Sequence, residues 1–335
     1  MGTNNNKTNA AKRGIFTSAG ATQKIVVILV IVALAVFFSV MSKPFRQYAT
    51  LVSIFDYSYY ISFMAIGVTF ALITGGVDLS IGTGMITCGL VGGYVIAHKA
   101  MPVGVGILVA LVIGLLFGLI NAMTVAVMEL PPFIATLCSM MLARGIGSIL
   151  TGALSVTWPP AGSEQGWVRS FFKYKTEGGL LIPVGFLLVI IAVIVMSLIL
   201  NHTRPGRYII AIGSNKEATR LSGIKVRKYQ GLAYLICGLF TGIAGIAYSC
   251  TFQAVAPGSG AGLELDAIAG AIIGGTSMNG GYGTITGTLL GVYVMSLLKT
   301  GLPYIGLQSN WQQIVTGIIL IIAVLVDVLK NTKGK

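Results

Sequence analysis

The sequence has few charged residues and too little polar side chain to cover a water-soluble globule of its length. Of its 335 residues, 9% are charged and 55% are hydrophobic, whereas a soluble domain carries about 25% charged residues. The 45 glycines follow no collagen-like period, and they suit close packing between membrane helices. The composition therefore indicates an integral membrane protein.

Residues that could carry chemistry are also scarce. The two histidines, His98 and His202, fall in loops predicted on opposite faces of a membrane, so no Ser-His-Asp triad is expected. The ATP-binding pattern GxxxxGK[ST] does not occur. Four cysteines stand far apart inside apolar runs, which suits neither a disulfide framework nor a zinc site: Cys88, Cys138, Cys237 and Cys250. We expect small packing cysteines, and no catalytic residue, metal, cofactor or enzyme activity in this chain.

Ten apolar stretches approach the length of about 20 residues that a helix needs to cross the hydrocarbon core. Phe37 and Phe38 stand where a signal peptide would need small residues, so the first stretch is expected to remain as a helix. The eighth is too short for a full crossing. The fold class is therefore all-α and polytopic, with about ten transmembrane helices. The predicted spans are 24–41, 51–73, 79–97, 103–127, 133–151, 180–200, 230–251, 263–275, 283–299 and 311–329.

The net charge of +13 predicts an orientation in the membrane rather than nucleic-acid binding. Lys and Arg gather in the N-terminal tail 1–23, the loop 201–229 and the C-terminal tail 330–335, and the positive-inside rule places all three in the cytoplasm. Six predicted spans precede the loop and four follow it, which agrees with that placement. The segment 152–179 is then the longest external loop.

Aromatic side chains mark this external loop. Trp158, Trp167, Phe171 and Phe172 all lie in it. Aromatic residues at a membrane interface are usually anchors, so anchoring is the expected role and recognition the alternative.

An internal repeat is visible when the chain is shifted by 199 positions. Gly75 and Gly76 then fall on Gly274 and Gly275, and further identities extend to position 95 of the first copy. On the predicted topology the two copies run in the same direction, so the repeat is parallel. Matching glycine-rich interruptions in two halves of a transporter point to broken helices and a site near the midplane.

The cytoplasmic loop contains the signals of a short capped helix. Ser214 and Glu217 have the spacing of a capping box, and Gly223 can adopt the left-handed conformation that ends a helix. A helix of about two turns is not stable alone in water. It must therefore rest on a surface, which is either this chain or a partner.

Charged residues near apolar spans are costly and tend to be functional. Asp78 lies in a glycine-rich break, where it is either a helix N-cap or a carboxylate in unwound backbone. Glu264 and Asp266 open the eighth span, where carboxylates complement a helix dipole. Arg144 is the most deeply placed cation, and we expect it to partner a carboxylate or helix-end carbonyls rather than a substrate. Asp56 also lies in an apolar span.

These stretches resemble the permease subunits of ribose-, xylose- and galactose-type ABC sugar importers, over nearly the whole chain from 54 to 327. The pair Pro131-Pro132, and Cys138 where such permeases often have glycine, depart from the pattern. The motifs that carry the resemblance are GVDLSIG at 76–82, PFIATL at 132–137, the loop 206–224, ELDAIA at 264–269, GGTS at 274–277 with GGYGT at 280–284, and the final 323–327.

The resemblance implies a bacterial inner-membrane protein with cytoplasmic termini, paired with a second permease copy, a homodimer being expected. It also implies an ATPase that holds ATP and Mg, and an extracytoplasmic sugar-binding protein. By this likeness the coupling helix takes Gly213, Asn215, Glu217, Ala218, Arg220, Ser222 and Gly223, and the translocation path takes Asp78, Ser80, Phe133, Ser277 and Asn279. Arg144, Glu264 and Asp266 remain structural or path charges.

Three other functions stay open at this point. One is a secondary transporter driven by protons or sodium, with Asp78 and Glu264 as the coupling carboxylates. A second is a membrane-embedded enzyme, which the lack of a paired nucleophile and base disfavours. The third is an ABC permease of the same fold for nucleosides or branched-chain amino acids.

Overall fold

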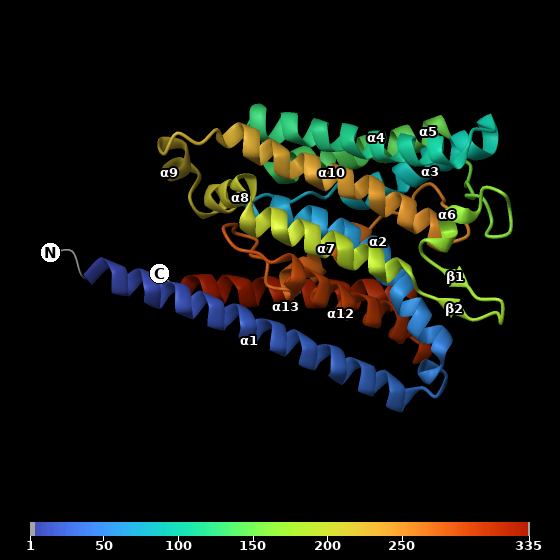
Figure 1. Cartoon of the computed structure of the whole chain (residues 1–335), viewed down its shortest axis with the longest axis horizontal. Helices are drawn as coiled ribbons and strands as arrows, with labels where there is room; N and C mark the ends of the chain where they lie inside the picture. The colour runs from blue at the N-terminus through green and yellow to red at the C-terminus, as the bar shows by residue number, and fades with distance from the viewer. Residues whose placement is uncertain (1–3, 334–335) are drawn as a thin grey trace.

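The structure, a computed structural model, describes the backbone of residues 4–333 and the side chains of 21–308 and 310–329. It is an all-α bundle whose long helices run side by side (Figure 1). Within this range, nine helices are long and apolar enough to cross a membrane. They are α1 (Asn4–Met41), α2 (Tyr48–Ile73), α3 (Ile81–Lys99), α4 (Val103–Asn121) continued by a π-helical segment (Ala122–Val127), α5 (Pro132–Leu150), α7 (Gly185–His202), α10 (Val226–Thr251), α12 (Ile285–Tyr304) and α13 (Ser309–Lys333).

The shorter elements separate to the two ends of the bundle. Helices α8 (Arg204–Ser214) and α9 (Lys216–Leu221) lie at the end where both chain termini lie (Figure 1). Helix α6 (Trp167–Ser170) and the antiparallel pair β1 (Tyr174–Lys175) and β2 (Leu181–Ile182) lie at the other end, and a 3₁₀ turn (Pro44–Arg46) joins α1 to α2. The predicted cytoplasmic loop and external loop are thus at opposite ends.

The centre of the bundle is formed by α2, α3, α10 and α12. In α2 and α3, 72% and 78% of the apolar window is buried, against 11% in α1 and none in α13. Helices α4 and α10 contact each other at glycine residues. A Cβ on Gly114 would lie 2.5 Å from the carbonyl oxygen of Gly238, and one on Gly118 would lie 2.8 Å from that of Tyr234. Small residues let the backbones approach as in other membrane helix pairs.

The eighth predicted span is a broken helix. Helix α11 (Leu263–Ile273) has 11 residues, which is about 16 Å of helix and only half of a hydrocarbon core of about 30 Å. Residues 274–284 complete the passage without a helix before α12 begins at Ile285. The prediction of broken helices is confirmed, and ten crossings are reached by counting α11 together with this segment.

The two breaks have the same cap. Two residues after the end of α2, Gly75 has φ +82°, and two residues after the end of α11, Gly275 has φ +97°. The amide of Gly76 donates to the carbonyl of Ala71, as the amide of Thr276 donates to that of Ala271. The caps therefore correspond at a shift of 200, one residue more than the sequence shift. The second connection is then longer, since α3 begins at Ile81 and α12 at Ile285.

The external loop is packed rather than laid on the surface. Trp158 is 0% exposed, and its indole N–H donates to the carbonyl of Gly89 at 2.9 Å. Phe172 is also buried, against Tyr59. The expectation of membrane anchoring is wrong for these two aromatics, because glycines on α3 and α7 make room for their rings. Trp167 and Phe171 are half exposed and remain free to anchor.

Candidate functional site

The loop between α7 and α10 folds into two short helices with separate caps. The Thr203 hydroxyl accepts the amide of Gly206 at the start of α8. Asn215 caps α9, because its side-chain oxygen accepts the amide of Ala218 at 2.9 Å. Ser214 is not the cap that the sequence predicted. It is the last residue of α8, and its hydroxyl donates to the carbonyl of Ile210.

Helix α9 is held to the bundle by one side chain and presents the rest outward. Thr219 is buried, and its hydroxyl donates to the carbonyl of Ala211 at 2.9 Å. Glu217 and Arg220 are exposed and form an ion pair of 2.6 Å along the helix. Leu221 is 79% exposed. This surface is suited to a partner rather than to the chain itself.

The end of α9 follows the prediction. Gly223 has φ +79°, and the amide of Ile224 donates to the carbonyl of Thr219, which is a helix-ending motif that glycine favours. The Ser222 hydroxyl donates to the carbonyl of Ala218. Of the predicted coupling residues, only Gly213 lies in α8 rather than in α9 or its caps.

Gly213 joins α8 to both helix breaks. A Cβ at Gly213 would lie 1.7 Å from the carbonyl oxygen of Ile73 and 2.4 Å from the amide nitrogen of Gly281. That amide donates to the same Ile73 carbonyl at 2.9 Å. The end of α2 and the segment after α11 are therefore bonded to each other, and α8 presses on their junction.

The segment 274–284 is held by side chains from the first and last helices. Gln23 of α1 donates to the carbonyl of Ile273 at the end of α11. Asp327 of α13 accepts the Ser277 hydroxyl at 3.1 Å and the Met278 amide at 3.0 Å. Asn279 is exposed, and its carbonyl lies against Gly75. Ser277 and Asn279 thus belong to this junction near α8.

Asp78 is buried in a polar network at the start of α3. Its carboxylate accepts the amide of Ser80 at 2.9 Å, the hydroxyl of Ser80 at 2.6 Å and the side-chain amide of Asn121 at 3.1 Å. The Ser139 hydroxyl completes the network by donating to Asn121. Asp78 therefore lies in the non-helical segment before α3, whose N-cap residue is Ser80, and the network of Asp78 and Ser80 joins the start of α3 to α4 and α5.

The five predicted path residues do not converge in this conformation. Asp78 and Ser80 are sealed inside the bundle, and Ser277 is buried near α8. Phe133 lies apart from them on α5, where it is 60% exposed. Their assignment to a path remains a prediction.

Two of the predicted charges occupy very different places. Asp266 forms an ion pair with Lys299 of α12, and the Thr316 hydroxyl of α13 donates to its other oxygen. Arg144 is exposed on α5. It is close enough to the Glu264 carboxylate to interact with it electrostatically, but the two form no ion pair among those of the described residues.

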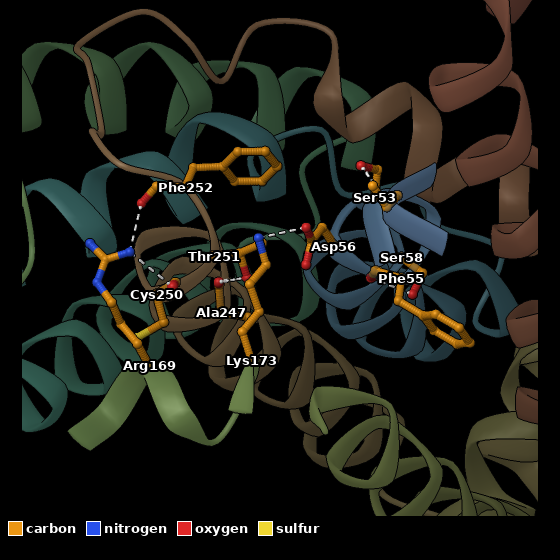
Figure 2. Close-up of polar contacts among 11 residues, drawn as sticks. Ser53, Phe55, Asp56, Ser58, Arg169, Lys173, Ala247, Cys250, Thr251 and Phe252 are labelled. Carbon is orange, nitrogen blue, oxygen red and sulfur yellow. Dashed lines mark hydrogen bonds and ion pairs between the residues drawn. The ribbon is translucent and has the colours of Figure 1, made fainter. Parts of the chain in front are cut away.

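A second group of charges joins the external loop to α10 and α2 (Figure 2). Arg169 donates to the carbonyls of Cys250 and Phe252 at the end of α10, and to those of Trp158 and Pro159. Burial lowers the pKa of its guanidinium, and these carbonyls replace the water it loses.

Lys173 lies one helical turn further along the same loop. Its ammonium forms an ion pair with the carboxylate of Asp56 in α2 (Figure 2), at 2.6 Å. The external loop therefore connects the outer ends of α2 and α10.

Sequence reasoning missed several of these residues, although some gave a signal. Lys299 stands near the end of a predicted apolar span, where a cation should have been paired with Asp266. Asn121 interrupts an apolar run in the same way. Arg169 and Lys173 gave no such signal in the sequence, because they lie in an irregular loop. Among the described residues, no group of three His, Cys, Asp or Glu could hold a metal.

The sequence of the chain matches a family model over residues 50–324, described as the permease component of a branched-chain amino acid transport system. The chain belongs to this permease family. The ribose import permease protein of Escherichia coli K12 is 35% identical over 316 residues, which covers 94% of this chain and 96% of that protein.

Two further relatives of this permease cover it to a similar extent. The galactose/methyl galactoside import permease protein of Escherichia coli K12 is 32% identical, and the alignment covers 92% of this chain and 94% of that protein. The fructose import permease protein of Bifidobacterium longum is 29% identical, and the alignment covers 96% of this chain and 95% of that protein. No solved structure matches the chain.

Proposed function

We propose that this permease is the membrane-spanning subunit of an ATP-driven monosaccharide importer, in which a separate subunit hydrolyses ATP. The relatives named as sugar import permeases align over more than nine-tenths of the chain. The observation that carries the coupling is the geometry of α9. It is a capped, outward-facing helix that follows directly on a helix in contact with both breaks.

The mechanism follows from that contact. A partner ATPase, which carries ATP and Mg, binds α9 on the cytoplasmic face and moves α8 as it closes. Because Gly213 touches the junction of Ile73 and Gly281, this movement reaches the ends of α2 and α11. The two broken helices then shift, and the bundle alternates between access to the two sides of the membrane. The chain itself needs no catalytic group.

A second copy of the chain covers the free face of α5. Arg144 lies on this face, and a cation turned to lipid at a helix centre costs about 2.5–3.5 kcal/mol on insertion scales. Phe133 and Cys138 are exposed on the same helix. A homodimer that encloses a polar path along α5 removes that cost. Phe133 then faces the path, as the resemblance implies.

The opposite end of the bundle receives the sugar-binding protein. The loop 152–184 is kept in place by the Arg169 and Lys173 contacts, so it offers a stable surface outside an inner membrane. Trp167 and Phe171 are half exposed on it. With this end outside, both termini and α9 are cytoplasmic.

Reconstitution tests the proposal. The permease, its ATPase and its binding protein are placed in vesicles, and ATP-dependent uptake of ribose, galactose, fructose and leucine is compared for wild type and Glu217→Arg. Sugar uptake that the substitution abolishes supports a sugar importer coupled through α9. Uptake of leucine alone would favour an amino-acid permease. Uptake by the chain alone under an ion gradient, without the ATPase, would establish the secondary transporter instead.

A further inference from the structure

A shallow apolar groove runs along the exposed side of α1. It is lined by side chains of α1 from Ile31 to Val40, and Arg46 of the 3₁₀ turn closes it. The Tyr48 hydroxyl donates to the carbonyl of Leu181 in β2, so the groove closes at the end of the bundle that carries the external loop. Helix α1 lies on the opposite side of the bundle from α5 (Figure 1), and the second copy proposed on α5 therefore leaves the groove facing lipid.

The length of the groove matches the depth of one lipid leaflet. From Ile31 to Val40 the helix rises about 14 Å, and half of the hydrocarbon core of a bilayer is about 15 Å. Arg46, beyond the last turn of α1, then stands at the level of the lipid phosphates. The groove therefore has the length for one acyl chain, with a basic residue where the head group of that chain begins.

Arg46 is held over the groove by the turn that carries it. Phe45 is buried, and its ring centroid lies 5.4 Å from that of Phe38 and 5.7 Å from that of Tyr304. The Nε of Arg46 donates to the carbonyl of Ser39 at 2.6 Å, one of the last carbonyls of α1, which have no partner within the helix. The two terminal nitrogens of Arg46 donate no hydrogen bond among those of the described residues. The guanidinium is thus fixed by one N–H and keeps the others for a ligand.

The charge around Arg46 favours an anion. Lys43 is exposed in the same turn, and the chain has no Asp or Glu before Asp56, which pairs with Lys173. The positive-inside rule disfavours Lys and Arg at the outer end of a membrane protein, so this pair of cations calls for a role there. A phosphate offers the acceptors that a guanidinium binds in pairs. The ammonium of a zwitterionic lipid is repelled by the same cations, whereas an anionic lipid has no such group.

We propose that the groove binds one anionic phospholipid, with its phosphate on Arg46 and Lys43 and one acyl chain along α1 as far as Ile31. Basic sites beside transmembrane helices recognise anionic head groups in this way. The placement of the lipid in the outer leaflet rests on the proposed orientation of the chain. The chemistry of the site does not depend on that orientation or on the cargo.

Fluorescence quenching at the site tests this inference. Cys138→Ser removes the exposed native cysteine, and the other native cysteines are buried. A fluorophore on Gln47→Cys, an exposed position next to Arg46, then reports on this end of the groove. The full-length permease is placed in phosphatidylcholine vesicles with rising fractions of nitroxide-labelled phosphatidylglycerol, or of phosphatidylcholine that carries the same nitroxide chain. The measurement uses neither ATP nor sugar, so its result is independent of the function proposed above.

We expect phosphatidylglycerol to reach half-quenching at a mole fraction about tenfold lower than phosphatidylcholine, because two cations meet its head group. Arg46→Gln and Lys43→Gln should each reduce this preference roughly fivefold, the effect of one cation near an anionic lipid. Arg46→Lys keeps the charge and should keep most of the preference. Lys99→Gln, which removes an exposed cation at the end of α3, should leave it unchanged.

A matched pair of substitutions tests the acyl chain. Val36 lines the groove, whereas Phe37 is exposed at the same depth outside it. Val36→Trp fills the groove and should raise the half-quenching fraction of phosphatidylglycerol several-fold, and Phe37→Trp should not.

Three results overturn the inference. Equal quenching by the two lipids in the otherwise unchanged chain means that the groove holds bulk lipid without selecting it. A preference that survives both Arg46→Gln and Lys43→Gln assigns the selection to other residues. Equal behaviour of Val36→Trp and Phe37→Trp places the acyl chain outside the groove. Since both cations are exposed side chains, Lys43→Gln carries the charge test by itself if Arg46→Gln does not fold.

Discussion

Gly213 of α8 lies directly against the carbonyl oxygen of Ile73, the last residue of α2. A Cβ at Gly213 would be 1.7 Å from that oxygen, far inside van der Waals contact. The same carbonyl accepts the amide of Gly281, so any displacement at Gly213 reaches both broken helices.

Gly213→Ala should therefore uncouple the ATPase from transport. The added methyl must push α8 away from the junction of α2 and the segment after α11, while α9 keeps its own caps and its exposed surface. We expect the ATPase to co-purify with the variant, and ATP-driven uptake in vesicles to fall at least tenfold. Both are measured on the same preparation.

Gly104→Ala is the matched control. Gly104 lies in α4, and nothing is within 4 Å of the position that its Cβ would take. Alanine also favours a helix over glycine by about 1 kcal/mol, so uptake should match the wild type. Normal uptake by Gly213→Ala would show that α8 tolerates the shift and that coupling runs elsewhere.

Glu217 and Arg220 offer a test of what α9 presents to its partner. Both side chains are exposed, so their pair contributes little to the stability of the helix itself. Glu217→Arg should lower ATPase binding and uptake. The double variant E217R/R220E restores an ion pair at the same spacing with the charges exchanged, and we expect it to stay impaired because the charges that meet the partner are reversed.

If ATPase binding and uptake recovered fully in E217R/R220E, the loss in Glu217→Arg would come only from a less stable α9. Helix content of the loop cannot be followed separately within such a helical protein, so ATPase binding is titrated directly by surface plasmon resonance. The variant Glu177→Gln, in the external loop, controls for the loss of one carboxylate.

The fold was largely predictable because apolar length and glycine content report directly on membrane helices. The break after α11 was visible as a span too short to cross. The sequence shift of 199 pairs Gly75 with Gly274, one residue before the cap at Gly275. The two caps themselves are 200 residues apart. The sequence did not reveal this, because the identical residues continue beyond the break at a shift of 199, and the helices that follow begin at Ile81 and Ile285, which correspond at neither shift.

The candidate site was less predictable, because partners distant in sequence decide what a polar residue does. Asp78 was expected to cap a helix or to lie in unwound backbone, and the latter is observed, since α3 begins at Ile81 with Ser80 as its N-cap residue, while Asn121 from α4 reaches the Asp78 carboxylate. Asn215 rather than Ser214 caps α9, because Ser214 is the last residue of a second helix, α8, that the sequence analysis did not predict, and its hydroxyl donates to the carbonyl of Ile210.

The ion pair of Asp266 and Lys299 should be a stability determinant rather than a coupling site. Both side chains are largely buried, and removing one partner of a buried pair costs about 3–5 kcal/mol, because the other charge is left alone. Lys299→Met should therefore lower the unfolding temperature strongly. The double variant D266N/K299M removes both charges and should recover much of the loss.

Thermal unfolding of the detergent-solubilised protein, followed by fluorescence-detected gel filtration at one heating rate, makes this comparison. Equal losses in the single and double variants would show that the two residues contribute independently. Uptake by the double variant should remain measurable, since neither group is placed on the proposed path.

Trp158 and Trp167 are a matched pair for separating burial from anchoring in the external loop. Trp158 is fully buried and donates its indole N–H to the carbonyl of Gly89, whereas Trp167 is half exposed. Trp158→Phe removes that hydrogen bond and part of a ring packed on Gly92 and Gly93, at a cost of about 1–3 kcal/mol.

Trp167→Phe leaves an aromatic ring in the same exposed place and should change the unfolding temperature little. We therefore expect Trp158→Phe to unfold at a lower temperature and to expose the loop to limited proteolysis, with Trp167→Phe close to wild type in both assays. If Trp167→Phe proved the more damaging in detergent, the loop would depend on its exposed aromatic, and the burial of Trp158 would not hold it in place. A loss that appears for Trp167→Phe only in lipid vesicles would instead identify Trp167 as a membrane anchor, because detergent lacks the ordered interface in which an indole is favoured.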